Sequence, residues 1–332
     1  MNIHQWKSQI RNFNKGFENS APKKQWDVNT KKNFHRFNKN NSIWSTQWRY
    51  SGEKEKAMIL VGSSPRLKED VKKLKAIDDD FIIICANSAL KYLLKNGVKP
   101  QYVISVDSDD IDIPQHLDIK EDGITLLASS VTCPEVLDKW NGPILFAPYY
   151  SIDMKLRPKL RAKLGRVVPC GGNSISEALV ISTVIWGGHT VIFVANELCF
   201  DKDYYADRKA AKQEELKRLY PTTDVIGRER WTLPSLYNYA IWIERVCLEL
   251  TPKGFFIDTS FGVLGKDRSA IHVVELSEAI EKVKKAFAIK KQLNKMDVKK
   301  QIVGELREND KSQMYCDHLQ AQRRALLRLA RN

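Results

Sequence analysis

Several short stretches of the sequence place small and polar residues directly after apolar runs, where they could bind phosphate. In ILVGSSPRLKEDV (59–71), a β-branched run meets Gly62, Ser63, Ser64 and Pro65 before a charged segment begins. A glycine lets a ligand approach the backbone, and free amides at a helix N-terminus attract phosphate. The same residues also suit a plain strand-to-helix turn, with Ser64 as the N-cap and Pro65 in the first helical position. Because the stretch matches neither G-x-x-x-x-G-K-[ST] nor G-x-G-x-x-G, both interpretations stay open.

Two further polar groups follow the next apolar runs of the chain. Asn87 and Ser88 come directly after FIIICA, and their side chains suit either a helix cap or contacts to a ribose or base. Asp107 ends the run YVISVD, where a carboxylate can hold a ribose hydroxyl or a divalent metal such as Mg²⁺. The acidic segment SDDIDI (108–113) follows it, and the alternative is a solvated turn.

A second glycine-containing segment and an acidic residue further along the chain complete the set of candidates. In C-G-G-N-S, Gly171 and Gly172 precede Asn173 and Ser174, either of which can cap the apolar helix expected next. Such a segment is a second candidate cradle for an anion. Glu197 follows the apolar run TVIFVA after one asparagine, so it is another polar residue at a strand end.

The elements that must position these residues are buried strands alternating with short amphipathic helices. This alternation predicts an α/β, Rossmann-like fold: a mostly parallel sheet with helices on both faces. In such sheets ligands bind beyond the carboxyl ends of the strands, which is where the candidate residues fall. We expect a Rossmann-like nucleotide-binding domain over residues 57–274, between an N-terminal arm (1–56) and a helical C-terminal extension (275–332).

The net charge of +14 is concentrated in the two extensions. Residues 1–50 hold ten Lys and Arg against two Asp and Glu, and residues 284–332 hold thirteen against five. Such basic segments favour a polyanion as partner, or they serve only as solvated tails. Aromatic residues interleaved with Lys and Arg in the first 50 positions either stack on single-stranded bases or, as we favour, anchor the arm on the main domain.

The spacing of the cysteines and the length of the apolar runs indicate the cellular compartment of the protein. Six scattered cysteines without a C-x-x-C pair indicate free thiols rather than disulfides or zinc, so we expect a cytoplasmic protein. No apolar run approaches the length of a transmembrane helix, and the first residues lack an apolar signal core.

Taken together, the order of these motifs resembles one family. Five motifs follow one another over about residues 57–265: strand–G-x-S-P–helix, an Asn-Ser pair, N-G-V-K-P-Q-Y-V-I-S-V-D, G-G-N-S-I-S and a strand ending N-E-L. This looks like the MptE-like 6-hydroxymethylpterin diphosphokinase family, which includes motility-associated-factor glycosyltransferases, with a distant similarity to bacterial sialyltransferases. The resemblance implies a nucleotide site, whose residues would be Gly62, Ser63, Ser64, Asn87, Ser88, Asp107, Gly171, Gly172, Asn173 and Ser174.

The resemblance also suggests catalytic roles. The sialyltransferases place a histidine base in an I-G-H segment, and the comparable segment here reads V-I-G-R, ending at Arg228. Arginine stays protonated, so Arg228 would stabilise leaving-group charge, and the adjacent Arg230 is an alternative. Glu197 is the candidate for acid–base work, and Asp107 would orient the ribose, bind a metal or take the proton. The loop around Arg228 would then cover the acceptor.

Three functions follow from this sequence. The first is a nucleotide-dependent transferase, with glycosyl transfer from a nucleotide-activated sugar to a large, anionic acceptor slightly favoured. The second is a diphosphokinase that uses ATP and Mg²⁺ to transfer pyrophosphate to a pterin-type alcohol, with Asp107 on the metal. The third is a protein that binds or modifies nucleic acid on a transferase fold, since the basic arms suit steeply salt-dependent binding.

Overall fold

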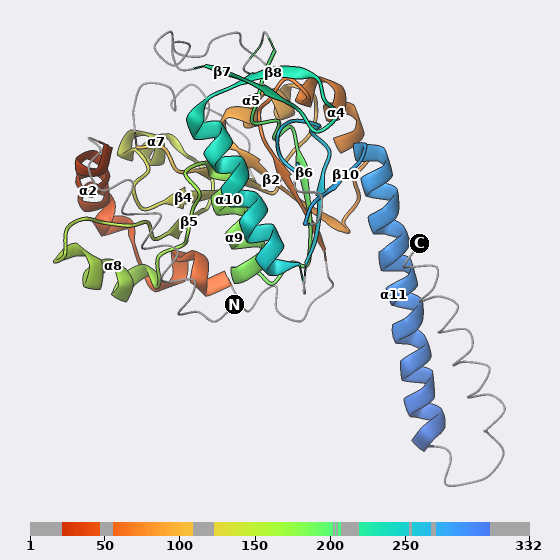
Figure 1. Cartoon of the computed structure of the whole chain (residues 1–332). Helices are drawn as coiled ribbons and strands as arrows, with labels where there is room; N and C mark the ends of the chain where they lie inside the picture. Colours follow the sequence, from red (N-terminus) through yellow and green to blue (C-terminus); the bar gives the residue numbers. More distant parts are fainter. Residues whose placement is uncertain are drawn as a thin grey trace. The chain divides into compact units, whose positions relative to one another are not determined.

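The computed structural model of the chain describes residues 22–46, 56–108, 123–201, 203, 205–206, 219–251, 254–266 and 270–305. Its body is an eight-stranded sheet in the order β10-β9-β6-β1-β2-β3-β4-β5, with helices on both faces (Figure 1). Every neighbouring pair in this sheet is parallel. The prediction of an α/β, Rossmann-like fold is therefore confirmed.

The sheet is made of short strands, and a separate two-stranded hairpin lies apart from it. The strands are β1 (Ala57–Val61), β2 (Phe81–Ala86), β3 (Tyr102–Ser105), β4 (Thr125–Ser129), β5 (Ile144–Ala147), β6 (Thr190–Val194), β7 (Tyr220–Thr223), β8 (Glu229–Thr232), β9 (Phe255–Asp258) and β10 (His272–Val273). The helices are α2 (Pro22–Asn33), α4 (Leu67–Leu74), α5 (Asn87–Lys95), α7 (Pro134–Lys139), α8 (Leu156–Leu164), α9 (Ser174–Val180), α10 (Pro234–Leu250) and α11 (Leu276–Glu305). The short turns are η1 (Phe34–Arg36), η2 (Lys39–Asn41), η3 (Ile43–Thr46) and the π-helical η4 (Ile181–Ile185).

Unbroken apolar runs form the central strands because both faces of a parallel sheet are covered. All residues of β1 and β2 are buried, and their side chains alternate between the two faces. Met58 and Leu60 belong to the core cluster that also holds the buried residues of α9 and α10. Every residue of α9 is buried, since this helix lies against β1, β2 and β3 and carries α10 on its other side.

The connections define where the direction of the sheet reverses. From β1 the chain adds β2 to β5 on one side, and it then returns to place β6, β9 and β10 on the other. Because parallel crossovers are right-handed, α4, α5 and α7 cover one face, and α9 and α10 cover the opposite one. The point of reversal lies between β1 and β6, which is the usual place for a ligand in open α/β sheets.

The described part of the N-terminal arm packs on the β5 end of the sheet. Phe37 is buried with its ring 4.9 Å from that of Phe146 on β5, and Trp26 packs edge-on against Tyr149. The indole of Trp44 donates to the carbonyl of Arg166, just after α8. These contacts favour anchoring of the arm over stacking on bases for the aromatic residues of the described arm. Trp6, Phe13, Phe17 and Trp48 lie outside the described residues.

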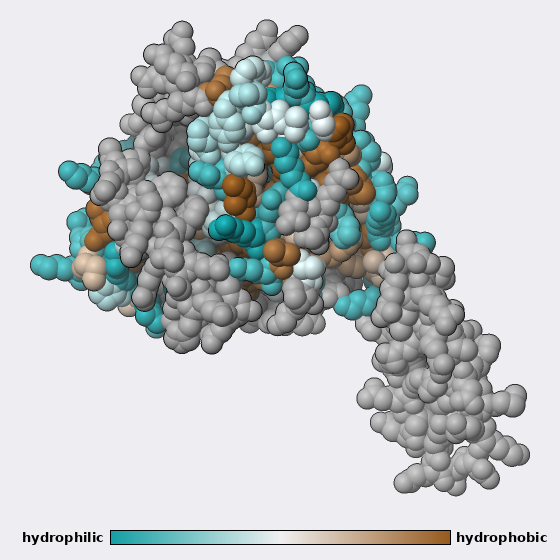
Figure 2. Space-filling view, viewed as in Figure 1, coloured by the Kyte–Doolittle hydropathy of each residue, from teal (hydrophilic) through white to brown (hydrophobic). Residues whose placement is uncertain are grey.

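The face shown in Figure 2 is crossed by α10, whose sequence is amphipathic. Ala240, Ile243 and Val246 are buried, whereas Ile241 and Leu248 are exposed.

Residues 228–232 were expected to form a loop, and this expectation was wrong for all of them except Arg228. Residues Glu229–Thr232 form β8, which pairs antiparallel with β7. The backbone of Trp231 also exchanges two hydrogen bonds with that of Phe200, which fixes the hairpin to the segment after β6. The alternation of residues over a short strand is weak, so the pattern alone did not reveal it.

The chain divides into two compact units at Leu276. The second unit contains most of α11, where Glu278 and Lys282 form an ion pair of 2.7 Å one turn apart. Among the described helices, none has the length and apolar character needed to span a membrane. The five described cysteines, Cys85, Cys133, Cys170, Cys199 and Cys247, are free thiols as expected.

Candidate functional site

The candidate loops meet at one edge of the sheet. All strands of the sheet are parallel, so the loops after β1, β2, β3 and β6 leave from the same carboxyl edge. The helix α9 precedes β6 in the crossover, so its N-terminus and the G-G-N-S segment start at this edge too. The sequence-based expectation that these segments converge is consistent with this topology.

The turn after β1 is tied to the turn after β6 by backbone hydrogen bonds. The N–H of Gly62 donates to the carbonyl of Val194 at 2.8 Å, and the N–H of Ser64 donates to that of Ala195 at 3.2 Å. A Cβ on Gly62 would lie 2.3 Å from the Ala195 carbonyl oxygen, so only glycine allows this approach. The two turns therefore close over the reversal point, and these amides are not available to a phosphate.

Glu197, rather than Ser64, accepts an amide at the start of α4. This helix begins at Leu67, two residues later than Ser64 and Pro65 predicted, and its N-cap residue Arg66 makes no side-chain cap. Instead the N–H of Arg66 donates to Oε2 of Glu197 at 3.0 Å. The expected Ser64 cap is thus wrong, because a carboxylate from another strand end occupies the position that a local cap would take.

Side chains of three neighbouring strand ends are joined in pairs. The hydroxyl of Ser88 donates to that of Ser63 at 2.8 Å, which links the loops after β1 and β2. The amide of Asn87 donates to Oδ2 of Asp107 at 3.1 Å, which links the loops after β2 and β3. Neither Asn87 nor Ser88 caps α5, whose N-cap is Ala86 without a side-chain bond. The pair was considered either as a helix cap or as a contact to a ribose or base, and the structure excludes the cap.

Asp107 is the residue expected to bind a divalent metal. It is exposed at the end of β3, and the hydrogen bond from Asn87 orients one of its oxygens. Within the described residues no group of three His, Cys, Asp or Glu could hold a metal ion, and Asp109, Asp110 and Asp112 lie outside that part of the chain. Mg²⁺ in phosphoryl-transfer sites is often held by one or two carboxylates together with substrate phosphates, so Asp107 fits such an ion in the presence of a nucleotide.

The G-G-N-S segment folds into a tight capping structure. Asn173 is the N-cap of α9, and its side chain accepts from the N–H of Ser176, as expected. The N–H of Gly171 donates to the Ser176 hydroxyl at 2.8 Å, and that of Gly172 donates to the Cys170 sulfur. The rings of Trp242 and Tyr239 lie directly against Gly171 and Gly172, where a Cβ would be only 2.6 and 2.5 Å away.

Glu197 lies beside a second acid that the sequence analysis did not select. Asp258, the last residue of β9, is fully buried and accepts from the N–H groups of Ser260 and Phe261. Burial, with a smaller contribution from the charge of Glu197, raises the pKa of Asp258 to about 7. Burial also raises the pKa of Glu197, whereas the hydrogen bond from the Arg66 amide and the charge of Arg230 lower it. One acid of this pair can therefore hold a proton near neutral pH.

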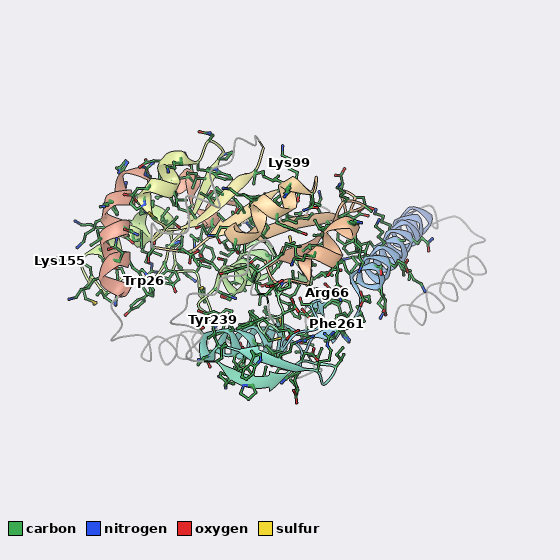
Figure 3. All side chains as sticks on the ribbon, turned by 90° about the horizontal axis from the view of Figure 1, so that it is seen from above. Trp26, Arg66, Lys99, Lys155, Tyr239 and Phe261 are labelled. Carbon is green, nitrogen blue, oxygen red and sulfur yellow. The ribbon has the colours of Figure 1, made fainter. Side chains whose placement is uncertain are left out.

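Of the two hairpin arginines, Arg230 is the one whose charge acts on Glu197. Arg228 donates to buried Asp224 at 2.6 Å within the hairpin, and its side chain is 49% exposed. Arg230 contacts the same carboxylate at 3.3 Å and is 17% exposed. Near these residues, Arg66 stacks its guanidinium on the ring of Phe261, as Figure 3 shows at the edge of the sheet. Arg230 is thus better placed than Arg228 to act at the carboxyl edge.

Asp258 and Glu177 carry signals that the sequence contains. Asp258 ends the apolar run FFID, which is the same pattern that pointed to Asp107. Glu177 is the one charged residue within the stretch SISEALVIS, and it is fully buried in α9. A systematic search for acids at strand ends or inside apolar runs would have found both.

The sequence and the fold were compared with known proteins. The family model of the 6-hydroxymethylpterin diphosphokinase MptE-like proteins matches residues 28–203. The chain belongs to this family. The match begins within α2, so it includes part of the arm that packs on the sheet, and it ends beyond β6.

A solved structure shares the fold of this MptE-like chain. The MAf glycosyltransferase from Magnetospirillum magneticum AMB-1 superposes with a TM-score of 0.51 at 14% sequence identity. The match covers 70% of this chain and 38% of that protein, so the present chain spans well under half of its length. No curated protein matched the sequence.

Proposed function

We propose that the chain is a nucleotide-dependent transferase that moves a glycosyl group from a nucleotide-activated sugar to a large acceptor. The observation that carries the proposal is the pair of hydrogen bonds, Ser63–Ser88 and Asn87–Asp107, across the ends of β1, β2 and β3. Polar side chains of three adjacent strand ends suit the ribose and phosphates of a nucleotide. The structural likeness to a glycosyltransferase supports the choice of the transferred group.

The nucleotide would be bound by side chains more than by a glycine-rich cradle. Amides of Gly62, Ser64, Gly171 and Gly172 already donate within the protein. The hydroxyls of Ser63 and Ser88 can rotate toward a phosphate, and the exposed carboxylate of Asp107 can accept from ribose hydroxyls. Asn173 and Ser174 would border this site from the start of α9.

The reaction requires a base and a group that stabilises the leaving nucleotide. In the proposed step, the acceptor hydroxyl gives its proton to Glu197, and its oxygen bonds to the anomeric carbon. The bond from that carbon to the phosphate oxygen breaks, and the leaving phosphate takes the electron pair. Arg230, or Arg228 after rotation out of the hairpin, would stabilise the charge on that phosphate.

Basic surface residues fit a large, anionic acceptor. Helix α8 carries Lys159 and Arg161 at exposed positions, and Lys155 precedes it at the same end of the sheet as Trp26 (Figure 3). Lys31 and Lys32 of α2 are also exposed. Such a surface attracts polyanions, nucleic acid among them, through a long-range and salt-sensitive field.

A second candidate is pyrophosphate transfer from ATP to a pterin-type alcohol. The exposed carboxylate of Asp107 favours it, because this group would help to hold the Mg²⁺ ion that ATP-dependent phosphoryl transfer uses. When bound, the ion would neutralise charge on the transferred phosphates. The matching family model, named for such a diphosphokinase, also supports this candidate.

The test compares nucleotide-induced thermal shifts and turnover in Asp107→Ala and in a matched control. Asp79→Ala removes another exposed carboxylate, in the turn before β2 at the opposite edge of the sheet. We expect UDP, GDP or CMP to raise the Tm of wild type and Asp79→Ala, and this shift to be lost in Asp107→Ala. A larger shift with ATP and Mg²⁺ than with these nucleotides would favour the second candidate. The absence of any nucleotide-induced shift, or full activity in Asp107→Ala, would contradict both.

A further inference from the structure

The turn between β5 and α8 carries its polar side chains inward and its apolar side chains outward. Ser151 is buried and Asp153 is partly buried, whereas Ile152 is 41% exposed and Met154 is 70% exposed. Apolar area in contact with water has a free-energy cost, so a turn at a protein surface ordinarily directs its polar side chains to the solvent. The reversed order at residues 151–154 indicates that these two apolar side chains have a partner outside the chain.

Hydrogen bonds to α2 hold this turn in place. The hydroxyl of Ser151 donates to Oδ1 of buried Asp27 at 2.6 Å, and the N–H of Asp153 donates to Oδ2 of the same carboxylate at 2.9 Å. Oδ1 of Asp153 in turn accepts from two N–H groups at the start of α8. Ile152 and Met154 are therefore presented outward by a turn that is fixed on both sides.

The exposed face of α2 adjoins the turn and continues its character. Lys31 forms an ion pair of 2.9 Å with Asp153, which places this face of the helix beside the turn. Val28 is three residues before Lys31 and Lys24 is four residues before Val28, so the three side chains lie on one face of the helix, and all three are exposed. An apolar side chain flanked by cations thus lies next to the apolar turn.

The helix that follows the turn adds further positive charge. Residues 155–166 hold six Lys and Arg and no Asp or Glu. Lys155, Lys159 and Arg161 are exposed, while the leucines of α8 are buried against the body. Figure 1 shows α2 and α8 at the same end of the sheet, and Figure 3 shows Lys155 at the end that holds Trp26 of α2. The turn and the exposed faces of α2 and α8 together form what we call the basic end.

An anionic bilayer matches both properties of the basic end. Its headgroups attract Lys and Arg, and its boundary with the acyl chains accepts apolar side chains. Nucleic acid would pair with the same cations, but its phosphates offer no contact for Ile152 and Met154, and stacking on its bases uses aromatic rings. Trp26 at this end packs edge-on against Tyr149 instead. The apolar turn therefore favours a lipid surface over a nucleic acid.

We propose that the basic end binds the surface of an anionic phospholipid membrane, with Ile152 and Met154 inserted at the boundary between headgroups and acyl chains. The inference goes beyond the proposed function and does not depend on it, since it concerns where the chain binds and not what it transfers. The turn follows β5, so it begins at the carboxyl edge of the sheet on which the candidate site residues gather. Binding there would bring that edge near an acceptor carried by the membrane.

Co-sedimentation of the full chain with lipid vesicles tests the proposal. Vesicles of phosphatidylcholine and phosphatidylglycerol in equal parts are compared with vesicles of phosphatidylcholine alone. We expect binding to the anionic vesicles only, and weaker binding as salt is added, because salt screens the cations. The double variant Ile152→Ser, Met154→Ser should bind the anionic vesicles at least about tenfold more weakly, because it removes the inserted apolar area without changing the charge.

The matched control is the double variant Ile241→Ser, Leu248→Ser on α10. It also removes two exposed apolar side chains without changing the charge, and it should bind the vesicles like wild type. The replaced side chains are exposed in both double variants, so the Tm of each should equal that of wild type. Met154→Ser alone, at the more exposed position of the turn, should show part of the loss. Lys155→Ser with Lys159→Ser should weaken binding and reduce its dependence on salt.

Three outcomes would overturn the inference. The first is that wild type does not bind the anionic vesicles, and binding to an RNA oligonucleotide in that case would assign the basic end to nucleic acid. The second is that the double variant of Ile152 and Met154 binds as tightly as wild type. The third is an equal loss in the control on α10. None of these measurements uses a nucleotide or a sugar donor, so their failure leaves the proposed transferase reaction untouched.

Discussion

The backbone N–H of Arg66 donates to Oε2 of Glu197 at 3.0 Å, across 131 residues of sequence. This bond joins the start of α4 to the end of β6, where the sheet reverses its direction. Glu197 therefore stabilises the fold at the same place where we propose that it acts as a base. The two roles use different properties of the carboxylate. Stabilising the fold needs only an oxygen that accepts a hydrogen bond, whereas acting as a base needs the negative charge.

Substitution of Glu197 separates these roles. Glu197→Gln keeps a carbonyl oxygen for the Arg66 amide, so we expect a stability change within about 1 kcal/mol. Loss of a general base should lower kcat by roughly 10²- to 10⁴-fold. Glu197→Ala should lose about 1–3 kcal/mol of stability as well, because the Arg66 N–H is left without its partner. Urea denaturation and steady-state kinetics measure the two effects, and a Gln variant with normal kcat would exclude the base.

The close approach of Gly62 to the turn after β6 makes it intolerant of a side chain. A Cβ there would meet the Ala195 carbonyl oxygen at 2.3 Å and the Asn196 side chain at 2.7 Å. We expect Gly62→Ala to destabilise the protein by about 2–4 kcal/mol, since backbone atoms must move. Gly187→Ala is the control, because φ is +74° there and no atom lies within 4 Å of the added Cβ. It should lose only about 1 kcal/mol, from backbone strain. Equal losses in the two variants would contradict the steric account.

Stability should fall as the pH rises through the neutral range. Burial raises the pKa of Asp258 to about 7 and that of Glu177 to about 8, so the folded state holds protons that the unfolded state has released. The stabilisation is complete below about pH 4, the unfolded pKa of these acids, and is lost as the pH passes 7 and 8. The slope is at most about 1.4 kcal/mol per pH unit for each group. Denaturation of Asp258→Asn at pH 4 to 8 should show a flatter profile than wild type below pH 7.

The described arm should influence the candidate site through Asn29. Its side-chain amide donates to the carbonyls of Ser108, next to Asp107, and Val131, at 2.8 and 3.0 Å. We expect Asn29→Ala to lose about 1–3 kcal/mol of stability and to weaken nucleotide binding several-fold, because the loop after β3 loses its support. Lys31→Ala on the same helix removes an exposed ion pair with Asp153, and it should leave both stability and nucleotide binding nearly unchanged. If both variants bind nucleotide equally well, the arm does not influence the candidate site.

The two arginines of the hairpin should contribute unequally to turnover. Arg230 is more buried than Arg228 and its charge acts on Glu197, so Arg230→Met should lower kcat by tenfold or more. Arg228→Met leaves Asp224 with Arg230 and should have a smaller effect. Kinetic comparison of the two variants checks the order, and the reverse order would restore the assignment made from sequence.

Local patterns determined the elements and the edge on which the candidate residues gather. Apolar runs such as FIIICA can be strands buried on both faces only in a covered parallel sheet, and parallel strands place Asn87, Asp107 and Glu197 at one edge. A cap at Asn173 or Ser174 was also predicted from sequence, because a capping box involves residues only three positions apart, and the structure places it at Asn173.

The tertiary structure decided which of these groups remain available for a ligand. The amides of Gly62 and Ser64 are used by the turn after β6, and the amide at the start of α4 is used by Glu197, more than 100 residues away. The burial of Glu177 likewise depends on which side chains surround it. Hydrogen-bond partners and burial of this kind are set by the packing of distant segments, so short-range sequence patterns do not predict them.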